Sequence, residues 1–357
     1  MVFRKGGPLA TYEKWFIGGD RLEVVREYKY LGMMFSTKLC TSVTLSDLAL
    51  RARTAVVHMC NSLRKLVHVT PTVFFKILDT QIQPVMLYAA EVWGLDDTTT
   101  IETVHILALK KFLNVSVRTP NIMVYGDTGR FPVSVNATIR SVKYWLKILR
   151  MDELRLPYQV YKMMLKNVDG RNSWARKVKR VLQSLEMGDI WERQSVSNES
   201  LFLKCLRERL IAKYDEMWRN KLDGSYRYVF YRQIKLVRGR ENYLYALDKR
   251  IVRDIFVRFR FGITDLYVHK FRYCDEGHST LCPLCNEEDE DEKHFLLECP
   301  ALYDLRRKYI FRHVHSTSSV LSDLLSAQSE NVIRSVGWYL VYAFKRRMDS
   351  LVLSVPF

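Results

Sequence analysis

The spacing of hydrophobic residues predicts a mainly α-helical chain. Leu48, Ala52, Val56, Met59 and Leu63 recur at intervals of three and four residues, which is the period of one helix face. Similar stripes predict helices at residues 44–66, 70–94, 100–113, 135–151, 173–186, 199–221, 302–311 and 331–348. Pro84 falls inside the second of these helices and should kink it.

Two parts of the chain depart from this helical period. Residues 15–17, 23–25 and 28–35 are short aromatic or β-branched runs, which predict strands. Two or three strands cannot bury both of their faces, so they must pack on helices or on a domain absent from this chain. Residues 249–261 fit both a helix and a strand, and the pattern leaves that choice open.

Composition indicates a folded protein. The chain has 357 residues, long enough for about two or three packed units. Hydrophobic residues make up 48% of it, far more than a disordered chain carries. No apolar run approaches the roughly 20 residues that cross a bilayer, and no signal peptide is evident, so we expect an intracellular protein of cytoplasm or nucleus. The seven cysteines are an odd number and are scattered, which favours thiols over disulfides.

A cysteine–histidine cluster predicts a metal site. Cys282, Cys285, His294 and Cys299 have the spacing C-x2-C-x8-H-x4-C. A tight CxxC turn can present two thiolates to one ion, and the second pair can complete a tetrahedron. We expect one zinc ion with a structural role, because four protein ligands leave no open position for catalysis. The alternative is four unrelated buried residues.

Charge along the chain indicates a polyanionic partner. The formal net charge is +17, yet residues 273–300 contain nine acidic residues and one lysine, so the remainder carries +25. Basic surfaces of that size favour nucleic acid. The candidate nucleic-acid contacts are basic residues that precede the cysteine cluster. The alternative is that these residues form a solvated basic face with no ligand. They are Arg250, Arg253, Arg258, Arg260, Lys270 and Arg272.

Six consecutive acidic residues, at positions 287–292, lie between Cys285 and His294. They would repel a phosphate backbone, so this acidic loop should not contact nucleic acid. We expect a solvated loop, with docking of a basic protein partner as the alternative.

The motifs together resemble the C-terminal part of non-LTR (LINE-type) retrotransposon reverse transcriptases. The resemblance rests on the opening Val2-Phe3-Arg4-Lys5-Gly6-Gly7, on Tyr30-Leu31-Gly32, on the stretch Gln83–Gly94 that ends in Trp-Gly, and on the Cys282–Pro300 segment. It implies a palm end at residues 1–40, a helical thumb at 41–150, a helical connector at 151–248, a basic segment with a zinc knuckle at 249–315, and C-terminal helices at 316–357. Tyr30, Leu31 and Gly32 would then lie near the primer grip, and the partner would be RNA or an RNA/DNA hybrid.

One departure from the family pattern bears on catalysis. These polymerases use a Tyr-x-Asp-Asp turn and an upstream aspartate to hold two metal ions, and the chain has neither. Asp96-Asp97 is interpreted as a helix cap. We therefore expect no catalytic residues and a non-enzymatic fragment that retains nucleic-acid binding. The alternatives are a zinc-knuckle module that binds protein, and a polymerase completed by a second polypeptide.

Overall fold

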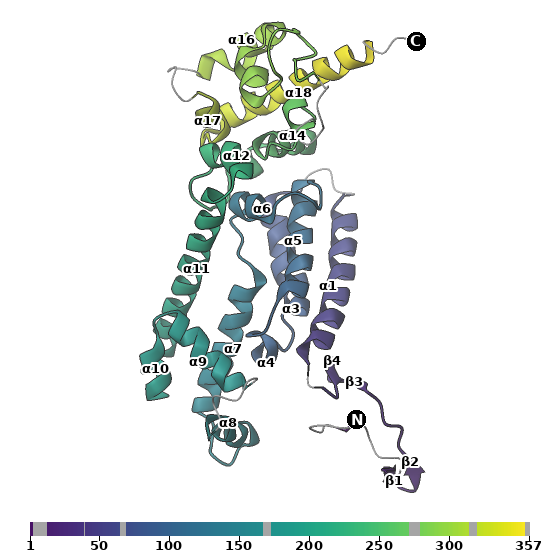
Figure 1. Cartoon of the computed structure of the whole chain (residues 1–357), viewed down its shortest axis with the longest axis vertical. Helices are drawn as coiled ribbons and strands as arrows, with labels where there is room; N and C mark the ends of the chain where they lie inside the picture. Colours follow the sequence, from purple (N-terminus) through teal and green to yellow (C-terminus); the bar gives the residue numbers. More distant parts are fainter. Residues whose placement is uncertain are drawn as a thin grey trace. The chain divides into compact units, whose positions relative to one another are not determined.

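The computed structural model is mainly helical, which confirms the expected fold class (Figure 1). It describes residues 1–2, 13–38, 40–64, 69–166, 173–270, 279–313 and 320–353. Most of the opening Val2–Gly7 motif, together with Arg272, lies outside the described residues. Among the described helices, none is both long and apolar enough to span a membrane.

Two short hairpins precede the first helix. Strand β1 (Phe16–Ile17) pairs antiparallel with β2 (Asp20–Arg21), and β3 (Glu27–Tyr30) pairs with β4 (Met33–Ser36). The single strand expected at residues 28–35 was wrong, because the backbone reverses at Leu31 and Gly32. Both residues have positive φ, 46° and 80°, as the tight turn of a two-residue hairpin requires. No strand forms at residues 23–25.

The chain divides into two compact units whose residues alternate along the sequence. The first comprises residues 1–59, 78–105 and 132–212, and the second residues 60–77, 106–131 and 213–357. The sequence predicted five consecutive segments. Their boundaries differ from those of the two compact units, and the division into five stays a prediction.

The first unit is a helical bundle whose core is rich in tryptophan. Trp145 stacks on Trp191 at 5.9 Å between ring centroids, and its indole N–H donates to the hydroxyl of Tyr161 at 2.8 Å. All three side chains are buried. The helices are α1 (Thr41–Arg64), α3 (Gln83–Met86), α4 (Ala90–Trp93), α5 (Thr99–Leu113), α7 (Val133–Leu149), α8 (Leu156–Lys166), α9 (Trp174–Ser184), α10 (Gly188–Arg193) and α11 (Glu199–Asp223), with α1, α5 and α11 continuing into the second unit.

The kink expected at Pro84 is a larger interruption. Helix α2 (Pro71–Ile77) passes into a π-helical turn at Leu78–Ile82 before the short α3. Proline lacks an N–H and its ring crowds the preceding turn, so the regular hydrogen-bond ladder cannot continue there. A second break follows at Ala89, where φ is 55°.

The second unit packs helices around the long C-terminal helix. Its remaining helices are α6 (Asn121–Thr128), α12 (Val229–Ile234), α13 (Tyr243–Ala246), α14 (Arg250–Arg260), α15 (Tyr267–Lys270), α16 (Tyr303–Tyr309), α17 (Val320–Leu325) and α18 (Glu330–Leu353). Helix α18 packs against α13, α14, α16 and α17, and Figure 1 shows α14, α16 and α17 beside it. The segment 249–261, which the sequence left open between helix and strand, contains the helix α14. Helix α6 was not predicted from the sequence.

Candidate metal centre and nucleic-acid interface

Four potential metal ligands meet in the second unit. The donor atoms of Cys282, Cys285, His294 and Cys299 all lie within 4.8 Å of one another. The sulfur atoms of Cys282 and Cys299 are 3.8 Å apart, and that of Cys285 is 3.3 Å from Nε2 of His294. This grouping confirms the predicted cluster, which could hold a metal ion.

The local backbone explains how these ligands converge. Pro283 and Leu284 separate the first two cysteines, and the N–H of Asn286 donates to the Cys282 carbonyl at 2.8 Å. Asn286 has a φ of 60°, a conformation that asparagine tolerates better than most residues. A π-helical turn at His294–Glu298 then brings Cys299 back, with its N–H donating to the His294 carbonyl at 2.8 Å.

Neighbouring groups orient the histidine and shift the pKa values of two of the cysteines. Nδ1 of His294 is 3.0 Å from a carboxylate oxygen of Glu288, which directs Nε2 towards the cysteines. The hydrogen bond between the two thiols lowers the pKa of Cys282 and raises that of Cys299, and the N–H groups of Leu284 and Cys285 further favour the Cys282 thiolate. Thiolate and imidazole donors held in this way fit a soft or borderline cation.

The cluster is anchored to α16 and α18 by side chains that reach its backbone. The hydroxyl of Tyr339 donates to the Phe295 carbonyl at 2.6 Å, and the guanidinium of Arg306 donates to the Cys299 carbonyl at 2.5 Å. These contacts satisfy carbonyl groups at the end of the π-helical turn. The metal-binding segment is therefore part of the core of the second unit.

The expectation of a fully solvated acidic loop was wrong. Glu290 is completely buried and forms a bidentate ion pair with Arg347, at 2.5 and 2.7 Å. Glu292 is also buried, and its carboxylate lies 2.6 Å from Nε2 of His269. Buried carboxylates need such partners, because an unpaired charge in a core is strongly unfavourable. The docking of a basic protein on this loop stays a prediction.

Two of the predicted nucleic-acid contacts are corrected by the structure. The guanidinium of Arg260 is fully buried and pairs with Asp127 at 3.0 Å. Arg253 is 7% exposed and lies over the ring of Phe112, 4.9 Å from its centroid. Both residues lie on the inner face of α14, so they stabilise the core and cannot reach a phosphate.

The remaining predicted contacts lie on the surface where the structure describes them. Arg250, Arg258 and Lys270 are exposed. Arg250 lies 3.6 Å from the carboxylate of Asp254, while Arg258 approaches the Asn114 carbonyl at 3.5 Å. Of these residues, Arg258 also lines a groove.

This groove has a volume of about 710 Å³ and is lined by three arginines, Arg118, Arg227 and Arg258. We call it the arginine groove. The hydroxyls of Thr119 and Thr264 also line it, and both are buried without a hydrogen-bond partner. Arginine forks bind phosphate oxygens, and the three arginines outnumber the one carboxylate of the lining, Asp265. The arginine groove can therefore accept an anion.

Sequence reasoning missed most of this groove. Arg118 and Thr119 precede α6, and Arg227 lies 31 residues before Arg258 in another helix-rich segment. Thr119-Pro120 was the available signal, since a threonine followed by proline often marks the start of a helix.

The turn expected near a primer grip is a surface feature of the first unit. Tyr30 and Leu31 are 59% and 74% exposed. The Leu31 carbonyl accepts a hydrogen bond of 2.5 Å from the Tyr88 hydroxyl, and the Gly32 carbonyl accepts one of 2.9 Å from Arg51. These bonds fix the hairpin turn against α1 and the segment before α4.

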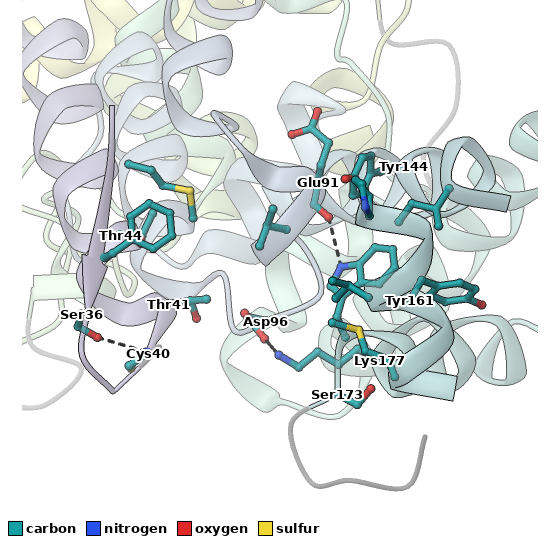
Figure 2. A pocket seen from close by; sticks show the side chains of 18 of the residues that line it. Ser36, Cys40, Thr41, Thr44, Glu91, Asp96, Tyr144, Tyr161, Ser173 and Lys177 are labelled. Carbon is teal, nitrogen blue, oxygen red and sulfur yellow. Dashed lines mark hydrogen bonds and ion pairs between the residues drawn. The ribbon is translucent and has the colours of Figure 1, made fainter. Parts of the chain in front are cut away.

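An apolar pocket of about 600 Å³ also lies in the first unit (Figure 2). Its walls come from β4, α1, α4, α7, α8 and α9, and Asp96 forms an ion pair with Lys177 at its edge. Trp174 donates from its indole N–H to the Glu91 carbonyl at 3.2 Å. Asp96 is thus used in an ion pair and not in a cap, whereas Asp97 accepts from the N–H of Thr99, the first residue of α5, at 2.9 Å.

The geometry therefore assigns two features to the second unit, a cysteine–histidine cluster and an arginine groove, and one apolar pocket to the first. Comparisons with protein-family models, with curated proteins and with solved structures each find no match for this chain.

Proposed function

We propose that this chain binds nucleic acid through its second unit, which a structural zinc ion stabilises. The arginine groove is the observation that carries this proposal. Three arginines share one concave surface whose lining contains a single carboxylate, Asp265, so positive charge is in excess there. Such a set matches the repeated phosphates of a nucleic-acid backbone better than a neutral ligand.

Zinc is the metal that best suits the cluster. Three cysteines and one histidine are a common ligand set for structural zinc, and thiolates discriminate against magnesium and calcium. The ion would hold the segment between Leu281 and Pro300 in its folded form. It would supply no chemistry, because four protein ligands fill a tetrahedral shell.

The resemblance of the motifs to the C-terminal part of non-LTR reverse transcriptases supports RNA or an RNA/DNA hybrid as the ligand. The described residues contain no Tyr-x-Asp-Asp turn, so the proposed role is to hold nucleic acid. Basic grooves of this kind bind the backbone with little dependence on sequence.

Salt dependence of RNA binding tests the proposal. We would measure the affinity of the full chain for a fluorescent RNA hairpin by anisotropy between 50 and 200 mM salt. Arg118→Glu, Arg227→Glu and Arg258→Glu should each weaken binding and flatten the salt slope by about 1, because each removes a phosphate contact. The control variant is Arg155→Glu. It makes the same charge change in the first unit, at an exposed residue just before α8.

The control separates a specific groove from general charge attraction. Equal losses in all four variants would contradict the arginine groove. Salt-insensitive or undetectable RNA binding by the wild-type chain would contradict the proposed function and would favour a protein-docking module.

A further inference from the structure

Three aromatic rings form a continuous stack on the second unit. The rings of Trp338 and Tyr342 have centroids 5.9 Å apart and planes 29° apart. Tyr342 in turn stacks on Tyr309 at 5.8 Å and 17°. We call these three residues the aromatic ladder.

The ladder is formed by Trp338 and Tyr342 of α18 and Tyr309 of α16. Trp338, Tyr342 and Lys345 follow the spacing i, i+4 and i+7, so they share one face of α18. Tyr342 is 42% exposed and Lys345 is exposed, Trp338 and Tyr309 are half-buried, and Tyr339 and Ala343 on the neighbouring face are buried. The ladder therefore lies at the edge of the core, and Tyr342 is its most exposed ring.

Positive charge surrounds the ladder. Nζ of Lys249 lies 5.1 Å from the ring centroid of Trp338, and Nζ of Lys308 lies 5.1 Å from that of Tyr309. A groove of about 550 Å³ runs beside Trp338 and is also lined by Arg312 and Arg334. The groove is of the size of ordinary ligand sites.

Acidic groups offset only part of this charge. Asp248 and Glu330 both pair with Arg334, at 3.2 and 2.5 Å, so they offset the charge of that arginine. Arg312 instead donates to the hydroxyl of Ser335 at 2.9 Å. Among the described residues, Lys249 and Lys308 lie over aromatic rings and Arg312 bonds a hydroxyl, so these three cations supply positive charge beside the ladder.

We propose that the aromatic ladder binds unpaired bases of a single-stranded nucleic acid. This inference rests on the proposed function and names the form of its ligand. A base can stack on an exposed ring, while a lysine that caps the ring moves to the adjacent phosphate. In a duplex the base faces already stack on one another, so the ladder favours single strands.

Paired binding measurements test this inference. The affinity of the full chain would be measured for a labelled 12-nucleotide oligouridine and for a blunt RNA duplex of equal length, at one salt concentration. Trp338→Ala should weaken binding to the single strand by roughly fivefold to a hundredfold, the range for losing one stacked base. Duplex affinity should change by less than about twofold.

Two further variants keep the result interpretable. Trp338→Phe retains a ring and should restore most of the single-strand affinity. Tyr303→Ala removes a 55% exposed tyrosine from α16 that lies outside the ladder, and should bind both ligands like the wild type. Circular dichroism would verify that each variant is folded, and a misfolded Trp338→Ala would be replaced by Tyr342→Ala.

The possible outcomes separate the two proposals. Unchanged single-strand affinity in the ladder variants, or an equal loss for duplex and single strand, overturns the ladder while leaving the arginine groove in place. If the wild type binds neither ligand, the proposed function and the ladder fall together.

Discussion

Individual side chains around the cluster decide how well it can hold a metal. Glu288 is the only described carboxylate that hydrogen-bonds the ring of His294, at 3.0 Å, although its side chain is 64% exposed. Such a group fixes the tautomer and the orientation of a ligand. Its loss should therefore lower the affinity for the metal more than it lowers the stability of the metal-saturated protein.

Glu288→Ala should weaken zinc binding by about tenfold, the lower end of the range for losing a partner of a metal-bound histidine, because the carboxylate is largely solvated. Competition with a chromophoric chelator measures this affinity. Glu287→Ala removes an exposed neighbouring carboxylate and should leave the affinity unchanged. Equal affinities for the wild type and Glu288→Ala would show that solvent orients the histidine equally well.

The buried carboxylate of Asp127 controls the stability of the second unit. Burial alone would raise the pKa of Asp127, but the guanidinium of Arg260 and the hydroxyl of Tyr231 hold that pKa below its usual range. The carboxylate also accepts a hydrogen bond of 2.8 Å from the Tyr243 hydroxyl. One charged group thus connects α6, α12, α13 and α14.

Asp127→Asn should lower the free energy of unfolding by about 3 kcal/mol, the lower end of the range for breaking a buried ion pair, because Arg260 would keep only Glu241, at 3.5 Å, as a counter-charge. Urea unfolding followed by circular dichroism gives the change. Asp223→Asn, which alters a 57% exposed carboxylate 3.9 Å from Arg232, should cost less than about 1 kcal/mol. Similar losses in the two variants would contradict the role given to the buried pair.

At the scale of elements, close helix packing in the first unit depends on a glycine. Gly94 follows α4, and α4 packs against α7. A Cβ atom at Gly94 would lie 2.5 Å from the carbonyl oxygen of Ala137 and 2.4 Å from that of Ala90. Backbone atoms cannot move aside as a flexible side chain can.

Gly94→Ala should therefore destabilise the chain by about 3 kcal/mol, at the upper end of the usual cost of overpacking. Gly188→Ala is a matched control, since its Cβ would meet its nearest neighbour at an ordinary 3.5 Å. That change should be neutral or stabilise by up to about 1 kcal/mol. Thermal unfolding of both variants measures the difference, and a neutral Gly94→Ala would indicate that α4 and α7 can separate.

Helices and their interruptions differed in how far the sequence could predict them. Amphipathic stripes located α1, α7, α11 and α18, because hydrophobic period reports burial directly. The break at Ala89 depends on tertiary packing and leaves no local signal. The hairpin turn at Leu31-Gly32 was missed because leucine is rare at positive φ, although glycine marked the place.

The candidate sites show the same division between local and long-range information. The spacing of the four metal ligands predicted their convergence, since it is short and set by two turns. The sequence could not show which arginines of α14 are buried, because the carboxylate that pairs with Arg260 lies 133 residues away in sequence. Charge patterns alone do not distinguish a paired core arginine from an exposed one.

At the scale of the whole molecule, the metal cluster belongs to only one of the two units. Its contacts through Arg306, Tyr339 and Arg347 all lie in the second unit. The tryptophan core around Trp145 lies in the first. Metal removal should therefore affect the two units unequally.

Treatment with a zinc chelator should raise amide hydrogen exchange in residues 279–302 and in α18, while peptides from α7 and α9 keep their protection. The physical reason is that structural zinc contributes about 10–16 kcal/mol of binding free energy in small fingers, as much as the whole stability of many domains. Hydrogen exchange read by mass spectrometry resolves the two sets of peptides. Added zinc should restore protection in the wild type and in Cys205→Ser, whose cysteine lies outside the cluster, but not in Cys282→Ser. Unchanged exchange after complete metal removal would show that the contacts of α16 and α18 hold the segment without an ion, whereas loss of protection in α7 and α9 would show that the two units unfold together.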